Sequence, residues 1–251
     1  MKKKLLILTD YYLPGYKGGG PVTSISNLIE VLNSVRDVHI FTRPHDCNEK
    51  IIYKNIDLNK WNFFRNNKIF YSFPNLALYK EILSLVNKNN DTKIYLNSFF
   101  SLYYSIVIVL LNKFNLLNNV KIIISPRGEL MAGALKLKYF KKAIYIFLFK
   151  YFLNKKNISF LSSSKTETLE IKKILSQKLK INSLPNISTS NSENIISKLK
   201  VNVPNHEFKN FSMVFVSRIV RKKGLDFILN TLRNCKNNIN FDIYGPIESE
   251  N

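Results

Sequence analysis

The sequence has few of the residues that mark several protein classes. Of its 251 residues only two are cysteine, Cys47 and Cys235, and they stand far apart, outside any C-x-x-C pattern. This excludes a disulfide framework and indicates a reducing compartment. His45 lies close to Cys47, but two ligands fall short of the four that structural zinc usually takes. No metal site is therefore predicted.

Long apolar runs are also missing. The opening MKKKLLILTD has an apolar stretch only over residues 5–8, which is shorter than the roughly 7–15 residues of a signal-peptide core. The strongest later run, SLYYSIVIVLL at 101–111, falls short of the roughly 20 residues that cross a bilayer. We interpret the first as a strand and the second as a buried helix, and we expect a cytoplasmic location.

Acidic side chains are scarce, because 17 Asp and Glu residues stand against 38 Lys and Arg, a formal net charge of +21. A basic surface attracts polyanions. However, lysine, asparagine and isoleucine are abundant throughout the chain, and no helix-turn-helix, zinc-finger or RRM signature accompanies the charge. Specific nucleic-acid binding is therefore not predicted.

Strand-like and helix-like segments alternate along most of the chain, which is typical of a parallel α/β sheet. The expected strands cover residues 5–9, 38–42, 68–72, 93–96, 121–125, 158–161 and 181–184. The expected helices cover residues 24–33, 76–87, 101–114, 135–153 and 165–176. The polar stretch 46–67 is expected to be a long loop.

The character of the sequence changes after the tripeptide LPN at 184–186, where a polar, proline-containing stretch begins. We predict a domain over 1–186, a linker over 187–210 and an incomplete second domain over 211–251. In the last we expect a strand at 211–216, a helix at 225–234 and a strand at 240–244. One βαβ element cannot bury its own apolar faces, so we expect exposed apolar surface there, with aggregation or pairing with a partner chain.

Glycine is rare too, yet three of the 8 glycines are consecutive: Gly18, Gly19 and Gly20 lie between the first strand and the first helix. Glycine has no Cβ, so the backbone there can approach a ligand and point N–H groups at it, and an anion suits a helix N-terminus. A flexible turn is the alternative. Neither the G-x-G-x-x-G pattern nor the P-loop pattern is present, so the loop alone does not name a ligand.

The second domain contains the phrase FVSRIVRKKGLDFILNTL at 215–232, in which Arg218 and Lys223 lie close to the start of a helix. Two cations beside helix N–H dipoles suit a diphosphate, because Arg grips two oxygens and Lys adds a point charge. A solvated charge cluster would look the same in the sequence.

This phrase resembles the G/S-R-x-x-x-x-K-G-x-x-x-L-I/L segment of family 4 retaining glycosyltransferases, the group 1 glycosyltransferases. Further segments look like motifs of that family in the same order: YYLPGYKGGGP resembles its glycine-rich loop, LSSSKTETLEI (161–171) its T/S-S-x-x-E stretch, and LPN its I/L-P-N. SPRGEL, at 125–130, resembles a form common in members that build surface polysaccharides. Together these motifs span nearly the whole chain.

The resemblance implies a B-type glycosyltransferase fold, here a complete N-terminal Rossmann-like domain on the acceptor side plus the first βαβ portion of a nucleotide-sugar-binding domain. It implies metal-independent transfer of a sugar, with retention, from a nucleotide-diphosphate sugar such as a UDP- or GDP-sugar, without a cofactor. Arg218 and Lys223 would be catalytic, because they would neutralise the donor diphosphate. Gly18, Gly19 and Gly20 would approach the donor.

Two departures from the family pattern affect the expected site. Many members place a histidine where this chain has SPRGEL, so we expect Arg127 or Glu129 to contact substrate on the acceptor side instead. The family's E-x7-E segment, which holds the donor sugar and ribose, has no counterpart after FDIYGPIESEN. The alternative is therefore a truncated, non-catalytic remnant or an acceptor-binding subunit that lacks its own donor site and relies on a partner chain.

Residues 135–156 alternate lysines with aromatic residues, and two interpretations remain open. A helix near anionic lipid headgroups would use both residue types, whereas a core helix would place its lysines at the solvent edge. The apolar stretch AIYIFLF at 143–149 favours burial. If the segment contacts a membrane, the acceptor would be a lipid-linked sugar at the inner face of the cytoplasmic membrane, in lipopolysaccharide or capsule synthesis.

Overall fold

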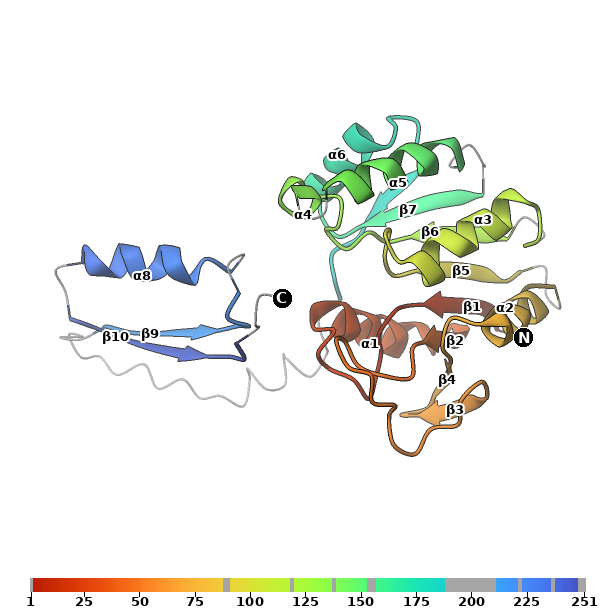
Figure 1. Ribbon diagram of the computed structural model, residues 1–251, viewed down its shortest axis with the longest axis horizontal. Helices are drawn as coiled ribbons and strands as arrows, with labels where there is room; N and C mark the ends of the chain where they lie inside the picture. The colour runs from red at the N-terminus through yellow and green to blue at the C-terminus, as the bar shows by residue number, and fades with distance from the viewer. Residues whose placement is uncertain are drawn as a thin grey trace. The chain divides into compact units, whose positions relative to one another are not determined.

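The computed structural model describes residues 2–87, 91–117, 120–136, 139–152, 157–187, 211–220, 223–235 and 238–247 (Figure 1). The chain divides into two compact units, Met1–Ser192 and Glu193–Asn251. All of the expected linker except Ile187 lies outside the described residues.

The first unit contains an eight-stranded sheet in the order β3-β4-β2-β1-β5-β6-β7-β8. Only the β3–β4 pair is antiparallel, and the other pairs are parallel. The central strands are buried on both faces, which explains their continuous apolar runs. The strands are β1 (Lys3–Leu8), β2 (Arg36–Thr42), β3 (Trp61–Phe64), β4 (Asn67–Tyr71), β5 (Lys93–Leu96), β6 (Lys121–Ile124), β7 (Ile158–Ser162) and β8 (Ile181–Ser183).

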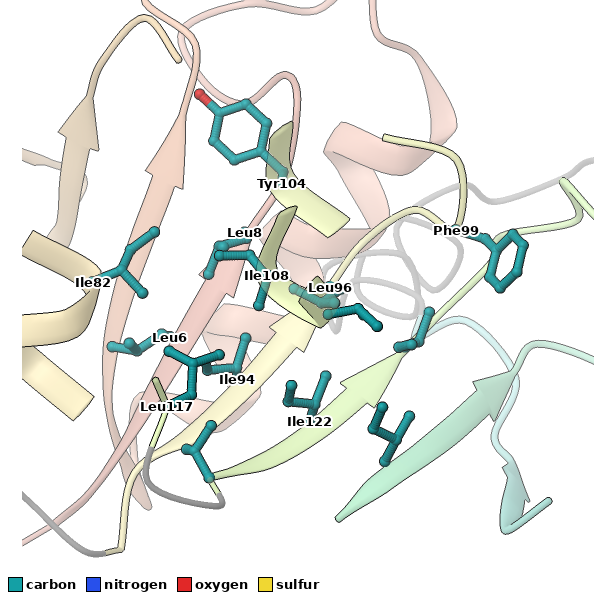
Figure 2. Packing of buried hydrophobic residues seen from close by; sticks show 14 of the residues in the cluster. Leu6, Leu8, Ile82, Ile94, Leu96, Phe99, Tyr104, Ile108, Leu117 and Ile122 are labelled. Carbon is teal, nitrogen blue, oxygen red and sulfur yellow. The ribbon is translucent and has the colours of Figure 1, made fainter. Parts of the chain in front are cut away.

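Helices cover both faces of this sheet. Because side chains alternate along a strand, Leu6 and Leu8 of β1 enter one core cluster with Ile82 and Ile108, while Leu5 and Ile7 enter a second cluster with Ile25 and Ile29. Figure 2 shows the first cluster, in which Leu6, Ile94 and Ile122 of three neighbouring strands lie on one face. The helices are α1 (Gly20–Leu32), α2 (Leu76–Asn87), the π-helical turn η1 (Leu102–Ile106), α3 (Val107–Lys113), α4 (Ala132–Lys136), α5 (Tyr139–Phe152) and α6 (Lys165–Ile174).

The second unit consists of β9 (Phe211–Val216), α8 (Leu225–Arg233) and β10 (Ile239–Tyr244), with β9 and β10 paired in parallel. No described residue of this unit is buried. The exposed surface expected from the sequence is confirmed, since Val216, Phe227 and Ile247 have exposed fractions of 76%, 74% and 80%.

The prediction of a long loop over 46–67 is wrong, because this stretch contains β3. Arg65 and Asn66 have φ angles of 47° and 63° and join β3 to β4 in a two-residue hairpin, a geometry that requires positive φ at both positions. The hairpin brings the Trp61 ring to 5.0 Å from His39 and 5.3 Å from Phe41, between ring centroids. The turn was not predicted because Arg65-Asn66 lacks the Asn-Gly or Asp-Gly pattern that is typical of such hairpins.

The prediction of one helix over 135–153 is also wrong, because the structure has two helices there, α4 and α5. The interpretation of AIYIFLF as buried is wrong as well: Phe149 is buried, but Ile144 and Phe147 have exposed fractions of 64% and 76%. Helix α5 packs through Tyr145, Ile146 and Phe149 against the first core cluster and leaves its other apolar residues uncovered. None of the helices in the described ranges is long and apolar enough to cross a membrane.

Candidate functional site

The strand order of the sheet diverges between β1 and β5, with β2 on one side and β6 on the other. In open α/β sheets ligands bind outside the carboxyl ends of the strands at such a point. Backbone hydrogen bonds hold the outgoing loops together there: Asn97 N–H donates to Leu8 C=O at 3.0 Å, and Ser125 N–H donates to Leu96 C=O at 2.9 Å. The loops after β1, β5 and β6 therefore leave the sheet side by side.

The glycine-rich loop follows β1 at this edge. Gly19 is the N-cap of α1, with φ 66° and ψ −137°, a conformation that favours glycine. A Cβ on Gly18 would lie 2.8 Å from a methyl carbon of Val22 and 3.2 Å from Tyr11 Cβ, whereas a Cβ on Gly20 would meet nothing within 4 Å. The fold therefore requires the first two glycines for steric reasons and leaves open space at the third.

Asp46 is buried and tethers the glycine-rich loop. Its Oδ2 accepts hydrogen bonds from the N–H groups of Tyr16 and Lys17 at 2.8 and 3.0 Å, and its Oδ1 accepts one from Cys47 N–H at 2.7 Å. Burial acts to raise the pKa of Asp46, but these N–H donors outweigh it and hold the pKa below its usual range. The N–H groups of Tyr16 and Lys17 thus already bind an anion, which is the protein's own carboxylate.

Asp10 and Arg43 form an ion pair at the ends of β1 and β2. The Nε and Nη2 atoms of Arg43 donate to Asp10 Oδ1 at 3.1 and 3.0 Å, and the guanidinium carbon lies 5.6–5.9 Å from the ring centroids of Tyr11, Tyr103 and Tyr104. Tyr103 has an exposed fraction of 37%. The edge of the sheet thus presents aromatic rings around a paired cation.

Arg127 lies in the turn after β6 and is held by contacts within the first unit. Its φ is 54°, which is uncommon for a residue with a side chain. Its Nε donates to Asn97 Oδ1 and its Nη2 to the Tyr95 hydroxyl, both at 2.9 Å, and its Nη1 donates to Asn186 Oδ1. The side chain therefore joins the end of β5 to the LPN segment.

Glu129 follows in the same turn and binds the loop after β5. Its Oε2 accepts hydrogen bonds from Phe99 N–H at 2.6 Å and Phe100 N–H at 3.1 Å, and its Oε1 accepts one from the Ser98 hydroxyl at 2.8 Å. Burial raises the pKa of Glu129, although these donors oppose the shift. A carboxyl with a perturbed pKa at the carboxyl edge of such a sheet is a functional-site candidate.

Glu167, in the stretch LSSSKTETLEI, is buried and fixes the turn that carries Arg127. Its Oε1 accepts a hydrogen bond from Gly128 N–H at 2.7 Å, and its Oε2 accepts from the Ser163 N–H and hydroxyl at 2.6 and 2.7 Å. Ser164 caps α6 by accepting from Glu167 N–H at 3.1 Å. This stretch therefore starts a helix and anchors a loop of the neighbouring strand at once.

Arg218 and Lys223 lie on the turn between β9 and α8 in the second unit. Val220 N–H donates to Arg218 C=O at 3.1 Å, and Lys223 N–H donates to Val220 C=O at 2.9 Å. Gly224 is the N-cap of α8, with φ 70°, and Lys223 is exposed. Arg218 thus lies two residues after the end of β9, and Lys223 lies two residues before the start of α8.

The structure brings the three glycines, Arg127 and Glu129 to the same edge of the first sheet, as described above. Asp10, Arg43 and Asp46 were not among the site residues predicted from the sequence. A usable signal exists for the first two, because Asp10 and Arg43 lie within two residues of the ends of the neighbouring parallel strands β1 and β2. Asp46 gives no such signal. In the described part of the chain, no group of three or more His, Cys, Asp or Glu side chains gathers as a metal site would require.

No protein-family model matches this chain, and no curated protein matches it. Among solved structures, the catalytic domain of starch synthase IV from Arabidopsis thaliana, bound to ADP and acarbose, aligns with a TM-score of 0.56 at 11% identity over 99% of this chain and 69% of that one. Two further structures, one from E. coli bound with UDP-2-fluoro glucose and one of trehalose-6-phosphate synthase, align with TM-scores of 0.46 and 0.43 at 10% and 11% identity. This chain spans 65% of each of these two.

At 11% identity the starch synthase likeness establishes the fold. The chain has the Rossmann-like α/β architecture of the B-type glycosyltransferase fold, with an eight-stranded sheet in the first unit and β9-α8-β10 in the described part of the second.

Proposed function

We propose that the chain acts in glycosyl transfer, moving a sugar with retention from a nucleotide-diphosphate sugar, a UDP- or GDP-sugar, to a saccharide acceptor. The main support is the B-type fold, which extends over 99% of the chain in the alignment with a protein bound to ADP and acarbose. Fold alone hosts many functions. The residue placements in both units therefore supply the specific argument.

The donor diphosphate would bind at the turn before α8. Arg218 and Lys223 flank this turn, and the N–H groups at a helix N-terminus add a favourable field for an anion. Negative charge grows on the diphosphate as the glycosidic bond breaks, and fixed cations stabilise that charge without reorganising. The reaction would then need no metal, and EDTA should leave it unchanged.

The acceptor would bind at the carboxyl edge of the first sheet. The rings of Tyr103 and Phe73 are exposed there, by 37% and 41%, and aromatic faces pack well against the apolar faces of sugar rings. Arg127 and Glu129 already make internal hydrogen bonds, so we assign them the task of holding the edge in shape beside the acceptor. Gly20, which has open space around it, is free to face a ligand.

The test of the donor site is calorimetry with UDP and GDP. A charge-assisted hydrogen bond is worth about 1.5–3 kcal/mol, so Arg218→Ala or Lys223→Ala should weaken binding roughly 10- to 150-fold. Arg233→Ala is the matched control, because Arg233 lies in the last turn of the same helix. Unchanged affinity in both variants, or equal loss in the control, would refute the assignment.

Helix α5 supports a lipid-linked acceptor. Its uncovered residues Phe140, Ile144 and Phe147 have exposed fractions of 82%, 64% and 76%, and Lys141 and Lys150 are exposed on the same helix. Apolar side chains enter the headgroup boundary while lysines attract anionic lipids, at about 1 kcal/mol for each cation. We therefore propose that α5 docks on the cytoplasmic face of the membrane, in lipopolysaccharide or capsule synthesis. Residues 137, 138 and 153–156 of the segment 135–156 lie outside the described residues.

Vesicle co-sedimentation tests this docking. Vesicles containing phosphatidylglycerol should retain the protein at low salt and release it at high salt, whereas phosphatidylcholine vesicles should not retain it. Phe147→Ser should lower the bound fraction. Phe63→Ser removes an equally exposed ring on β3 and serves as the control. Equal binding by both variants, or no binding by the wild type, would contradict the proposal.

A second function is favoured by one observation, the lack of buried residues in the described part of the second unit. Exposed apolar strands and helices attract partners, so the chain would be an acceptor-binding subunit whose donor site depends on a partner chain. This alternative predicts vesicle or saccharide binding together with no binding of UDP or GDP by the isolated chain.

A further inference from the structure

The amino edge of the first sheet, opposite the edge described above, contains a basic hollow. Its volume is about 720 Å³, and residues at the starts of β1, β2 and β4 line it together with neighbouring loops. Five of the lining residues are cations and two are aspartates. The cations are Lys2, Lys3, Lys4, Arg36 and Lys68.

The parallel register of the sheet brings these cations together. Lys3 of β1 is the register partner of Arg36 of β2, and Lys93 of β5 is the partner of Lys121 of β6. Each of the neighbouring strands β4, β2, β1, β5 and β6 thus has a cation among its first residues. Cations that are spread along the sequence are therefore concentrated at this edge of the sheet, where they produce a positive electrostatic potential.

Aspartates neutralise only part of this positive charge. Asp91 pairs with Lys3 at 2.9 Å and Asp37 pairs with Lys68 at 2.8 Å. The Nη1 atom of Arg36 is buried and has no hydrogen-bond partner among the described residues, which is unfavourable for a polar group. Burial, together with Arg36, Lys121 and Lys3, lowers the pKa of Lys93. The positive charge around the hollow therefore exceeds the negative charge of its two aspartates, and a bound anion would reduce the repulsion between the cations.

We propose that this hollow binds a compact anion with two or more linked phosphate groups, through residues other than the proposed donor contacts Arg218 and Lys223. The volume lies in the range of small-molecule pockets, roughly 300–1,000 Å³. Cations converge on it from several strands, and a concave surface of this kind suits a small multivalent anion better than a long nucleic acid or a flat bilayer. Arg36, one of the lining cations, has a planar guanidinium group that can donate two parallel hydrogen bonds to one phosphate group.

The test is calorimetry with sodium tripolyphosphate, in a protein that already has Arg218→Ala and Lys223→Ala so that the proposed donor contacts are removed. Adding Lys4→Gln and Arg36→Gln should weaken binding at least about tenfold, since two cations that line the hollow lose their charge. The matched control adds Lys172→Gln and Lys173→Gln, which remove the same charge from the last turn of α6 and should change affinity less than about twofold.

Thermal melting provides the second readout and shows that the variant folds. In low-salt buffer without multivalent anions, the Lys4→Gln/Arg36→Gln protein should melt at the same temperature as its parent or higher, because like-charge repulsion is reduced. Tripolyphosphate should raise the melting temperature of the parent and not that of the variant. Absence of binding to the parent, an equal loss in the control, or binding confined to duplex RNA or anionic vesicles would each overturn the proposal.

Discussion

Replacing Asp46 with asparagine should loosen the glycine-rich loop. The carboxylate accepts hydrogen bonds from the N–H groups of Tyr16, Lys17 and Cys47. An amide has one acceptor oxygen, so its NH2 group must face at least one of these N–H donors. The variant therefore loses one charged hydrogen bond outright, and the other bonds lose the assistance of the charge.

The size of the effect follows from those contacts. A hydrogen bond to a charged group contributes about 1.5–3 kcal/mol, and weaker neutral bonds at the remaining donors add to the loss, which gives a decrease in the free energy of unfolding of about 2–4 kcal/mol. For a chain of this size, that corresponds to a fall in melting temperature of roughly 4–16 °C. Asp57→Asn is the control, because Asp57 is an exposed loop residue.

Urea denaturation measures the decrease in the free energy of unfolding. Hydrogen exchange measures the local effect, because the amides of Tyr16, Lys17 and Cys47 should exchange faster in the variant. The effect should also depend on pH. The pKa of Asp46 is lowered in the folded state, so its contribution is present above the unfolded value of about 4 and is lost as the pH falls through the folded value. The stability gap between wild type and Asp46→Asn should shrink below about pH 4. A gap that is absent at pH 7, or that stays constant down to pH 3, would refute the reasoning.

Four further substitutions test the local geometry. Gly18→Ala should destabilise the protein by about 1–3 kcal/mol, because its Cβ would crowd a buried valine, while Gly20→Ala should be neutral or up to about 1 kcal/mol stabilising in the same urea titration. Gly245→Ala should unfold β9-α8-β10, since its Cβ would lie 1.7 Å from the carbonyl oxygen of Ser217; unchanged amide protection in β10 would contradict this. Glu167→Gln should lower stability by about 2–4 kcal/mol and speed exchange at the Gly128 amide, and a melting temperature equal to wild type would argue against the anchor.

Much of the first unit could be predicted from the sequence because its signals are local. Continuous apolar runs predicted the central strands, and β1 and β5 were placed within two residues of their observed bounds. The glycine triplet marked the turn before α1, and two of its members have conformations or contacts that require glycine. Periodicity and turn chemistry act over a few residues, so they can be read before the chain folds.

The places where prediction failed depend on neighbours distant in the sequence. The uncovered face of α5 is one example, since an apolar helix is buried only where another element covers it, and Phe149 alone of its ring-bearing residues with described side chains is fully covered. The hairpin between β3 and β4 is another example, because it packs the Trp61 ring against Phe41 of β2 and Phe70 of β4.

The sequence by itself determined the alternation of strands and helices, the break in composition after residue 186, and the two cations before α8. Tertiary structure alone decided the roles of the buried carboxylates. Asp46, Glu129 and Glu167 accept N–H groups that lie 30, 30 and 39 positions away. The physical reason is that these carboxylates and N–H donors become neighbours only after the strands have paired in register and brought separate loops to one edge. No local pattern of residues predicts such a contact.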